Sequence, residues 1–107
     1  MNIGIAIKTI RTHFGISQED LSLKTGISQT SISQIENGLK NPSKRTIKKI
    51  CDVFQIPEAI VYIIGVDHSD VPESRKKIFD QLFPQIKELA IQIIGNRKSK
   101  LIQGNQN

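Results

Sequence analysis

The 107-residue sequence has no long apolar run, no tryptophan and only one cysteine. A membrane-spanning helix needs about 20 consecutive apolar residues, and no stretch of this chain approaches that length. Lys8 and Arg11 interrupt the only apolar stretch near the start, so the layout of a secretory signal is missing as well. The sequence therefore predicts a soluble, cytoplasmic protein with a single core and no membrane partner.

The scarcity of cysteine and histidine excludes further classes of protein. Cys51 has no second cysteine to pair with, and its spacing from His13 and His68 does not suit a zinc site. We expect Cys51 to be a small core residue and the two histidines to lie at the surface or in a linker. No nucleophile, base and orienting group can be nominated together, so the sequence predicts neither an enzyme nor a bound metal or cofactor.

Positive charge is present in excess. Fifteen Lys and Arg against ten Asp and Glu give a net charge of +5, which favours an anionic partner. Within residues 40–49 there are five cations and no acid. These cations are Lys40, Lys44, Arg45, Lys48 and Lys49. This basic segment is either part of a surface that meets an anion or an ordinary solvated face.

Apolar residues recur at three- and four-residue spacings through the first 65 residues, which is the pattern of amphipathic helices. Capping residues and glycines separate the runs, and no segment alternates as a strand does. The sequence therefore predicts an all-α fold of five short helices. We expect these helices at residues 2–14, from 18 to 24 or 25, at 29–36, after Ser43, and from Pro57 to Gly65.

A second helical region is expected beyond residue 65. Residues 66–71 are predicted to form a linker, 72–95 a helical extension and 96–107 a flexible basic tail. Pro84 predicts a kink or break near Gln81, leaving one kinked helix or two. The extension carries an apolar seam made of Phe79, Leu82, Phe83, Ile86, Leu89 and Ile93. Such a seam must pack against another apolar surface. We favour a homodimer over packing of the extension on its own domain or binding of another protein partner.

The second and third predicted helices are joined by a short turn that contains Gly26, the arrangement that presents the second helix of such a pair to DNA. The run ISQEDLSLKTGISQTSISQIENG, residues 16–38, closely resembles the Cro/repressor-type (XRE-like) helix-turn-helix family of phage repressors and bacterial regulators. The resemblance covers about residues 5–65. Ser22 replaces the family's usual alanine and Thr25 another small residue, and both are small enough to fit.

This resemblance implies a lambda-repressor-like DNA-binding domain whose third helix reads bases. Ile32 and Ile35 must face the core, which leaves polar side chains on the other faces of that helix. Amides can pair with adenine and hydroxyls can meet base edges or phosphates, so a reading role competes with that of ordinary surface residues. The expected base-reading residues are Gln29, Thr30, Ser33 and Gln34.

The same resemblance implies phosphate contacts on both sides of the reading helix. Gln18 would bind a phosphate and brace Gln29, while the role of Lys48 and Lys49 stays open. An ion pair between Arg11 and Glu36 would join the reading helix to the scaffold. The expected phosphate ligands are Gln18, Ser28, Ser31, Lys40, Asn41, Ser43, Lys44 and Arg45.

These features predict a regulator that binds double-stranded DNA in a sequence-specific manner, a repressor acting as a homodimer on a palindromic operator. One reading helix sees only a few base pairs, so two copies should dock about one DNA turn, ~34 Å, apart. The alternative is the antitoxin of a toxin–antitoxin pair, which would regulate itself through the same domain and capture a toxin with residues 72–95.

Overall fold

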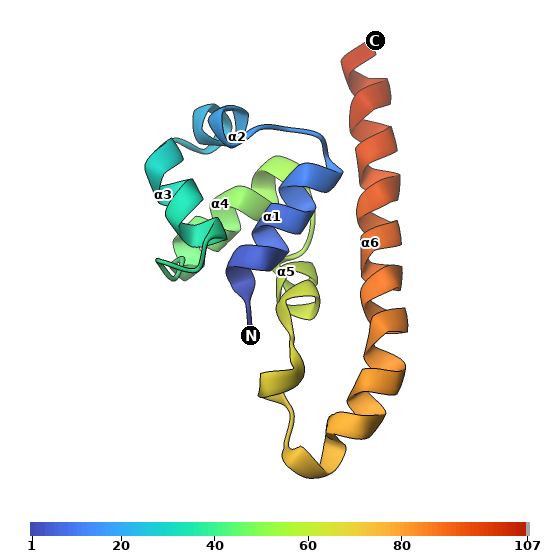
Figure 1. Cartoon of the computed structure of the whole chain (residues 1–107). Coiled ribbons are helices and arrows are strands. Elements are labelled where there is room, and N and C mark those ends of the chain that lie inside the picture. Colours follow the sequence, from blue (N-terminus) through green and yellow to red (C-terminus); the bar gives the residue numbers. More distant parts are fainter. Residues whose placement is uncertain (107) are drawn as a thin grey trace.

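A computed structural model describes the backbone of residues 1–106 and the side chains of residues 1–95. Every regular element of this part is helical, so the all-α fold predicted from the sequence is confirmed (Figure 1). The α-helices are α1 (Ile3–His13), α2 (Gln18–Thr25), α3 (Gln29–Glu36), α4 (Lys44–Phe54), α5 (Glu58–Gly65) and α6 (Lys76–Gln106). Two short 3-10 helices, η1 (His68–Asp70) and η2 (Glu73–Arg75), precede α6.

Side-chain caps fix where the first four helices begin. In each case an oxygen of the residue before the helix accepts a hydrogen bond from a backbone N–H of the first turn, a group that has no partner inside the helix. The capping residues are Asn2, Ser17, Ser28 and Ser43. Pro57, which we expected inside the fifth helix, instead precedes it with an extended ψ of 145°, and α5 begins at Glu58.

The apolar faces of α1 to α5 meet in one core. Phe54 of α4 is its largest fully buried side chain, and Cys51 is buried as a small core residue, as predicted. Helix α1 crosses α3 closely at Gly4, where an added Cβ would lie 2.1 Å from the carbonyl oxygen of Ile35. The close approach of these two helices therefore depends on the missing side chain at Gly4.

Helix α6 differs from the predicted extension in its limits and continuity. It begins at Lys76 rather than Pro72 and continues past Gly95 to Gln106. It also passes through Pro84 as one helix. Pro84 has no N–H to donate to the carbonyl of Asp80, and because Asp80 is exposed, water can satisfy that carbonyl instead. The predicted linker contains η1, and the side chains of the predicted basic tail lie outside the described residues.

Helix α6 folds back along the domain and packs on α1 and α5 (Figure 1). Ala90 and Ile94 are buried and belong to the same core as α1 to α5. The end of α1 also lies under α6, where His13 faces Gly95. His13 is therefore not a surface residue as predicted: its Nε2 is buried and has no hydrogen-bond partner among the described residues. Within the same part of the chain, no helix combines the length and apolar composition needed to cross a membrane.

Candidate nucleic-acid interface

The turn between α2 and α3 consists of Gly26, Ile27 and Ser28. Gly26 adopts a left-handed conformation with φ 76°, and its N–H donates to the carbonyl of Ser22 at 2.9 Å. The hydroxyl of Thr25 donates to the carbonyl of Leu21 at 2.7 Å and accepts from the N–H of Ile27 at 3.2 Å. Thr25, a departure from the family pattern, therefore stabilises the turn that sets the angle of α3.

Helix α3 presents an uncharged, hydrogen-bonding surface. Ile32 and Ile35 are buried in the core, as their spacing predicted. The polar residues on its other side are those that the sequence predicts to contact bases, and we call them the reading face: Gln29, Thr30, Ser33 and Gln34. Ser33 is half-buried and the other three are exposed. Together with Gln18 they line a shallow depression of about 300 Å³. This surface can donate and accept hydrogen bonds to the edges of bases.

The basic segment follows the reading face directly. All five of its predicted phosphate ligands, Lys40, Asn41, Ser43, Lys44 and Arg45, are exposed in the α3–α4 loop and the first turn of α4. Lys40 Nζ donates to Ser31 Oγ on α3 at 3.1 Å, a contact that the sequence did not indicate. Two of the expected phosphate ligands, from the loop and from the reading helix, are thereby brought to one place.

The capping serines have unequal freedom to bind a phosphate. Ser28 and Ser43 each accept from a backbone N–H, at 3.1 Å in both cases. The hydroxyl of Ser43 also donates to Thr46 Oγ1 at 3.1 Å. Ser28 keeps its own proton for a ligand, whereas Ser43 would have to turn its hydroxyl away from Thr46 to donate to a phosphate.

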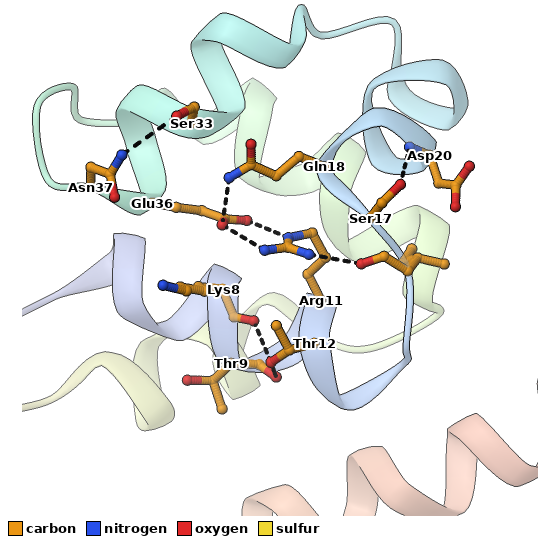
Figure 2. Close-up of polar contacts among 11 residues, drawn as sticks. Lys8, Thr9, Arg11, Thr12, Ser17, Gln18, Asp20, Ser33, Glu36 and Asn37 are labelled. Atoms are coloured by element: carbon orange, nitrogen blue, oxygen red, sulfur yellow. Dashed lines mark hydrogen bonds and ion pairs between the residues drawn. The ribbon is translucent and has the colours of Figure 1, made fainter.

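A buried ion pair holds α3 against the scaffold. Arg11 of α1 donates to Glu36 of α3 through Nε at 2.7 Å and through Nη2 at 2.9 Å (Figure 2). Arg11 Nη1 donates in addition to the carbonyl of Ile16 at 2.8 Å. The hydrogen bonds to Glu36 raise the pKa of Arg11 above its ordinary value. The fixed charge pair therefore ties the end of α3 to α1, and Arg11 also holds the loop that precedes α2.

Gln18 takes part in the same network. Its Nε2 donates to Glu36 Oε1 at 3.1 Å, so the amide of Gln18 braces Glu36 rather than Gln29 (Figure 2). No hydrogen bond joins Gln18 to Gln29 among the described residues. The expected contact is replaced because the buried carboxylate of Glu36 is the stronger acceptor within reach.

The residues expected at a dimer contact divide into two groups on α6. Phe79 and Phe83 are half-buried and stack on each other, with ring centroids 4.6 Å apart. The other four, together with Ile78, which the seam did not include, are each between 49% and 61% exposed. These five form the outer stripe, defined as Ile78, Leu82, Ile86, Leu89 and Ile93.

Comparisons with known proteins agree with this geometry. A family model described as helix-turn-helix matches residues 7–61, which include α2, the turn and α3. One uncharacterized HTH-type transcriptional regulator of Archaeoglobus fulgidus is 32% identical over 70% of this chain, which covers only 38% of that relative. Another from the same organism is 32% identical over 64% of this chain and 94% of its own length.

A third Archaeoglobus fulgidus protein with the same description is 40% identical over 45% of this chain and 69% of its own length. No solved structure matches the chain with statistical significance. The family model covers just over half of the chain, and the matched residues contain both the turn and the reading face. The chain therefore belongs to the Cro/repressor-type helix-turn-helix family of DNA-binding transcriptional regulators.

Proposed function

We propose that this protein is a repressor that binds a palindromic DNA operator as a homodimer and recognises its sequence through α3. The observation that carries the proposal is the reading face itself. Gln29, Thr30 and Gln34 are exposed, uncharged and fixed on a helix whose opposite side is buried in the core. Side-chain amides in this position can pair with two atoms of an adenine edge in the major groove.

The charged residues supply affinity rather than sequence preference in this proposal. Lys44 and Arg45 stand at the start of α4, where the free N–H groups of the first turn add to their attraction for a phosphate. Lys40 and Ser31 are already in contact, so a phosphate placed between them would receive two donors that need little rearrangement. These contacts would hold the register of α3 in the groove.

The small size of one reading helix and the outer stripe of α6 support the proposed homodimer. The five side chains of the outer stripe expose on the order of 400–500 Å² of apolar surface, the size of the largest apolar patch on a typical monomer, which is often functional. A second copy would cover this surface and bring a second α3 to the next half-site. Occupancy of such a site would be enough to block access to a promoter.

Selection of bound fragments from random DNA tests the proposal directly. We expect enriched palindromes with half-sites about 10 base pairs apart. On the selected site, Gln29→Ala should cost about 1–3 kcal/mol and relax preference at one base pair of each half-site. The matched control is Gln81→Ala, which replaces an exposed glutamine of α6 and should change neither the affinity for the selected site nor the base preference. Equal losses of Gln29→Ala on selected and random DNA would contradict its role as a reader.

The assembly is best tested by charge rather than by truncation. Removing the chain after Val66 would also remove Ala90 and Ile94 from the core, so a loss of binding would have two explanations. Leu82→Asp with Leu89→Asp changes only exposed side chains. The double variant should stay folded by circular dichroism, sediment as a monomer and lose most operator affinity. A dimer that persists in this variant would place the contact elsewhere and favour a partner-capture role for α6, as in an antitoxin.

A further inference from the structure

Helix α6 has two apolar faces that point in different directions. Ala90 and Ile94 pack on the domain, and Leu89 and Ile93, one residue earlier in each case, belong to the outer stripe. Successive residues of an α-helix are about 100° apart around the axis. The outer stripe therefore faces sideways, about a quarter turn from the direction in which α6 meets its own domain.

The direction of the outer stripe restricts how two copies can use one operator. Helix α3 lies on the side of the domain away from α6 (Figure 1). Two copies in contact through their outer stripes can be related by a two-fold axis in either of two directions. An axis that runs along the helices makes the two α6 helices parallel, and an axis at right angles to them makes the helices antiparallel. The parallel case would carry the second domain to the opposite side of the helix pair, with its α3 facing away from the first. The antiparallel case leaves both domains on one side.

The sequence of the outer stripe is also close to symmetric about its own centre. Leu82 and Leu89 lie equally far from the midpoint between Gln85 and Ile86, as do Ile78 and Ile93. In an antiparallel pair centred there, leucine meets leucine and isoleucine meets isoleucine. An in-register parallel pair also matches each residue with its own copy, so the symmetry allows the antiparallel arrangement and the shape of the surface must distinguish the two.

The shape of the surface supports the same arrangement. An apolar hollow of about 290 Å³ lies beside the first half of the outer stripe, where Phe79, Leu82 and Phe83 are among the residues that line it. The most exposed side chain of the stripe, Leu89 at 61%, lies in the second half of the stripe. Antiparallel pairing seats this side chain of each copy in the hollow of the other, in the manner of a knob in a hole. Parallel pairing would set hollow against hollow.

We propose that two copies of this chain pair through α6 in an antiparallel arrangement, with Leu82 against the partner's Leu89. The inference rests on the proposed homodimer and adds its orientation and register. It assigns the outer stripe to a second copy of the chain and explains why the stripe is turned aside from the domain. In this dimer both reading faces lie on the same side of the α6 pair and can meet one DNA duplex.

Cysteine cross-linking in the full chain tests the orientation. Leu82→Cys and Leu89→Cys are made separately, and each is oxidised with copper–phenanthroline alone and after mixing the two proteins. In the antiparallel dimer, identical positions are ~10 Å apart along the axes, too far for a disulfide, whereas position 82 meets the partner's position 89. The mixture should therefore form linked dimers at least about tenfold faster than either variant alone. Cys51 is buried and does not compete.

Gln81→Cys mixed with Glu88→Cys is the matched control, because these exposed positions have the same spacing on the solvent side of α6. This control should link only at the slow rate of random collision. Faster linking of Leu82→Cys with itself would establish a parallel pair and overturn the proposal. A chain that sediments as a dimer without linking, or as a monomer, would overturn it too. Operator selection with the unmodified chain decides separately whether the protein recognises a DNA sequence. Failure of the antiparallel pairing can therefore be distinguished from failure of the proposed function.

Discussion

Neutralising Glu36 is the most direct test of how the reading helix is held. The Glu36 side chain is 1% exposed and accepts two hydrogen bonds from Arg11 and one from Gln18. Glu36→Gln keeps the shape of the side chain, so it creates no cavity, but it leaves the guanidinium of Arg11 buried without a counter-charge. It also turns one acceptor into an amide donor that faces other donors.

The expected loss follows from the burial of both partners. Removing one member of a buried ion pair costs about 3–5 kcal/mol, which is a large part of the 5–15 kcal/mol that stabilises a typical domain. Arg11 is itself buried, so solvent screens little of this cost. With a urea dependence of about 2 kcal/mol per molar, the unfolding midpoint should fall by about 1.5–2.5 M.

Urea unfolding followed by circular dichroism at 222 nm measures this shift. Glu88→Gln, an exposed glutamate on α6, is the control and should change stability by less than about 0.5 kcal/mol. The apolar double variant Arg11→Met with Glu36→Leu should recover much of the loss, because it removes both buried charges together. A midpoint for Glu36→Gln no lower than that of Glu88→Gln would refute the view that this pair holds α3 in place.

Three further outcomes are expected. In binding titrations between roughly 50 and 200 mM salt, Lys44→Ala should lower the slope of log affinity against log salt by about one unit and leave sequence preference unchanged. An unchanged slope would remove Lys44 from the phosphate ligands. Gly4→Ala should lower the stability of the fold in urea, because the new Cβ would lie 2.1 Å from the carbonyl oxygen of Ile35. Inside an unhindered helix the same change normally stabilises by about 0.5–1 kcal/mol, so a more stable variant would contradict the close approach of α1 and α3. Burial raises the pKa of the Cys51 thiol from its ordinary 9.0 to about 11. Between these two pH values the folded chain keeps the thiol proton and the unfolded chain loses it, so the free energy of unfolding should fall as the pH rises through this interval. Ellman's reagent at pH 8 should react with the thiol only after urea is added, and rapid reaction without urea would show that the site is open.

The helices of the domain could be predicted because each is coded locally. Ser17 and Ser28 cap their helices by contacts within three residues, and Ile32 and Ile35 are buried by a spacing that one helix alone determines. Pro57 shows the limit of such local rules. Both the first helical position and the capping position accept its fixed φ, so the proline alone does not say which of the two it occupies.

The course of α6 was harder to predict, because its apolar residues cover two adjoining faces. The spacing showed a wide seam but gave no reason why Ala90 and Ile94, rather than Leu89 and Ile93, should pack on the domain. The burial of His13 Nε2 beside Gly95 was missed for the same reason, since that contact joins residues 82 positions apart. Such choices depend on the shape of the surface between α1 and α5, which no local pattern describes.

The candidate interface shows the same division between local and distant information. The exposure of Gln29 and Thr30 follows from the helix period, whereas two contacts that organise the interface do not. Gln18 reaches Glu36 across 18 residues, and Lys40 reaches Ser31 across a loop. Each joins a side chain to an acceptor that only the folded turn brings within reach.

Buried contacts connect the two halves of the proposed function. Ile94 of α6 is packed in the core that contains α1, Arg11 of α1 is bonded to Glu36, and Glu36 ends the helix that carries the reading face. The path from the outer stripe to α3 therefore runs through packed side chains rather than through the segment between α5 and α6. In a dimer joined at the outer stripe, the separation of the two reading helices would be set by these contacts. Such a dimer should accept one half-site spacing and reject an operator lengthened by one base pair, which turns the second half-site about the DNA axis by roughly 35°.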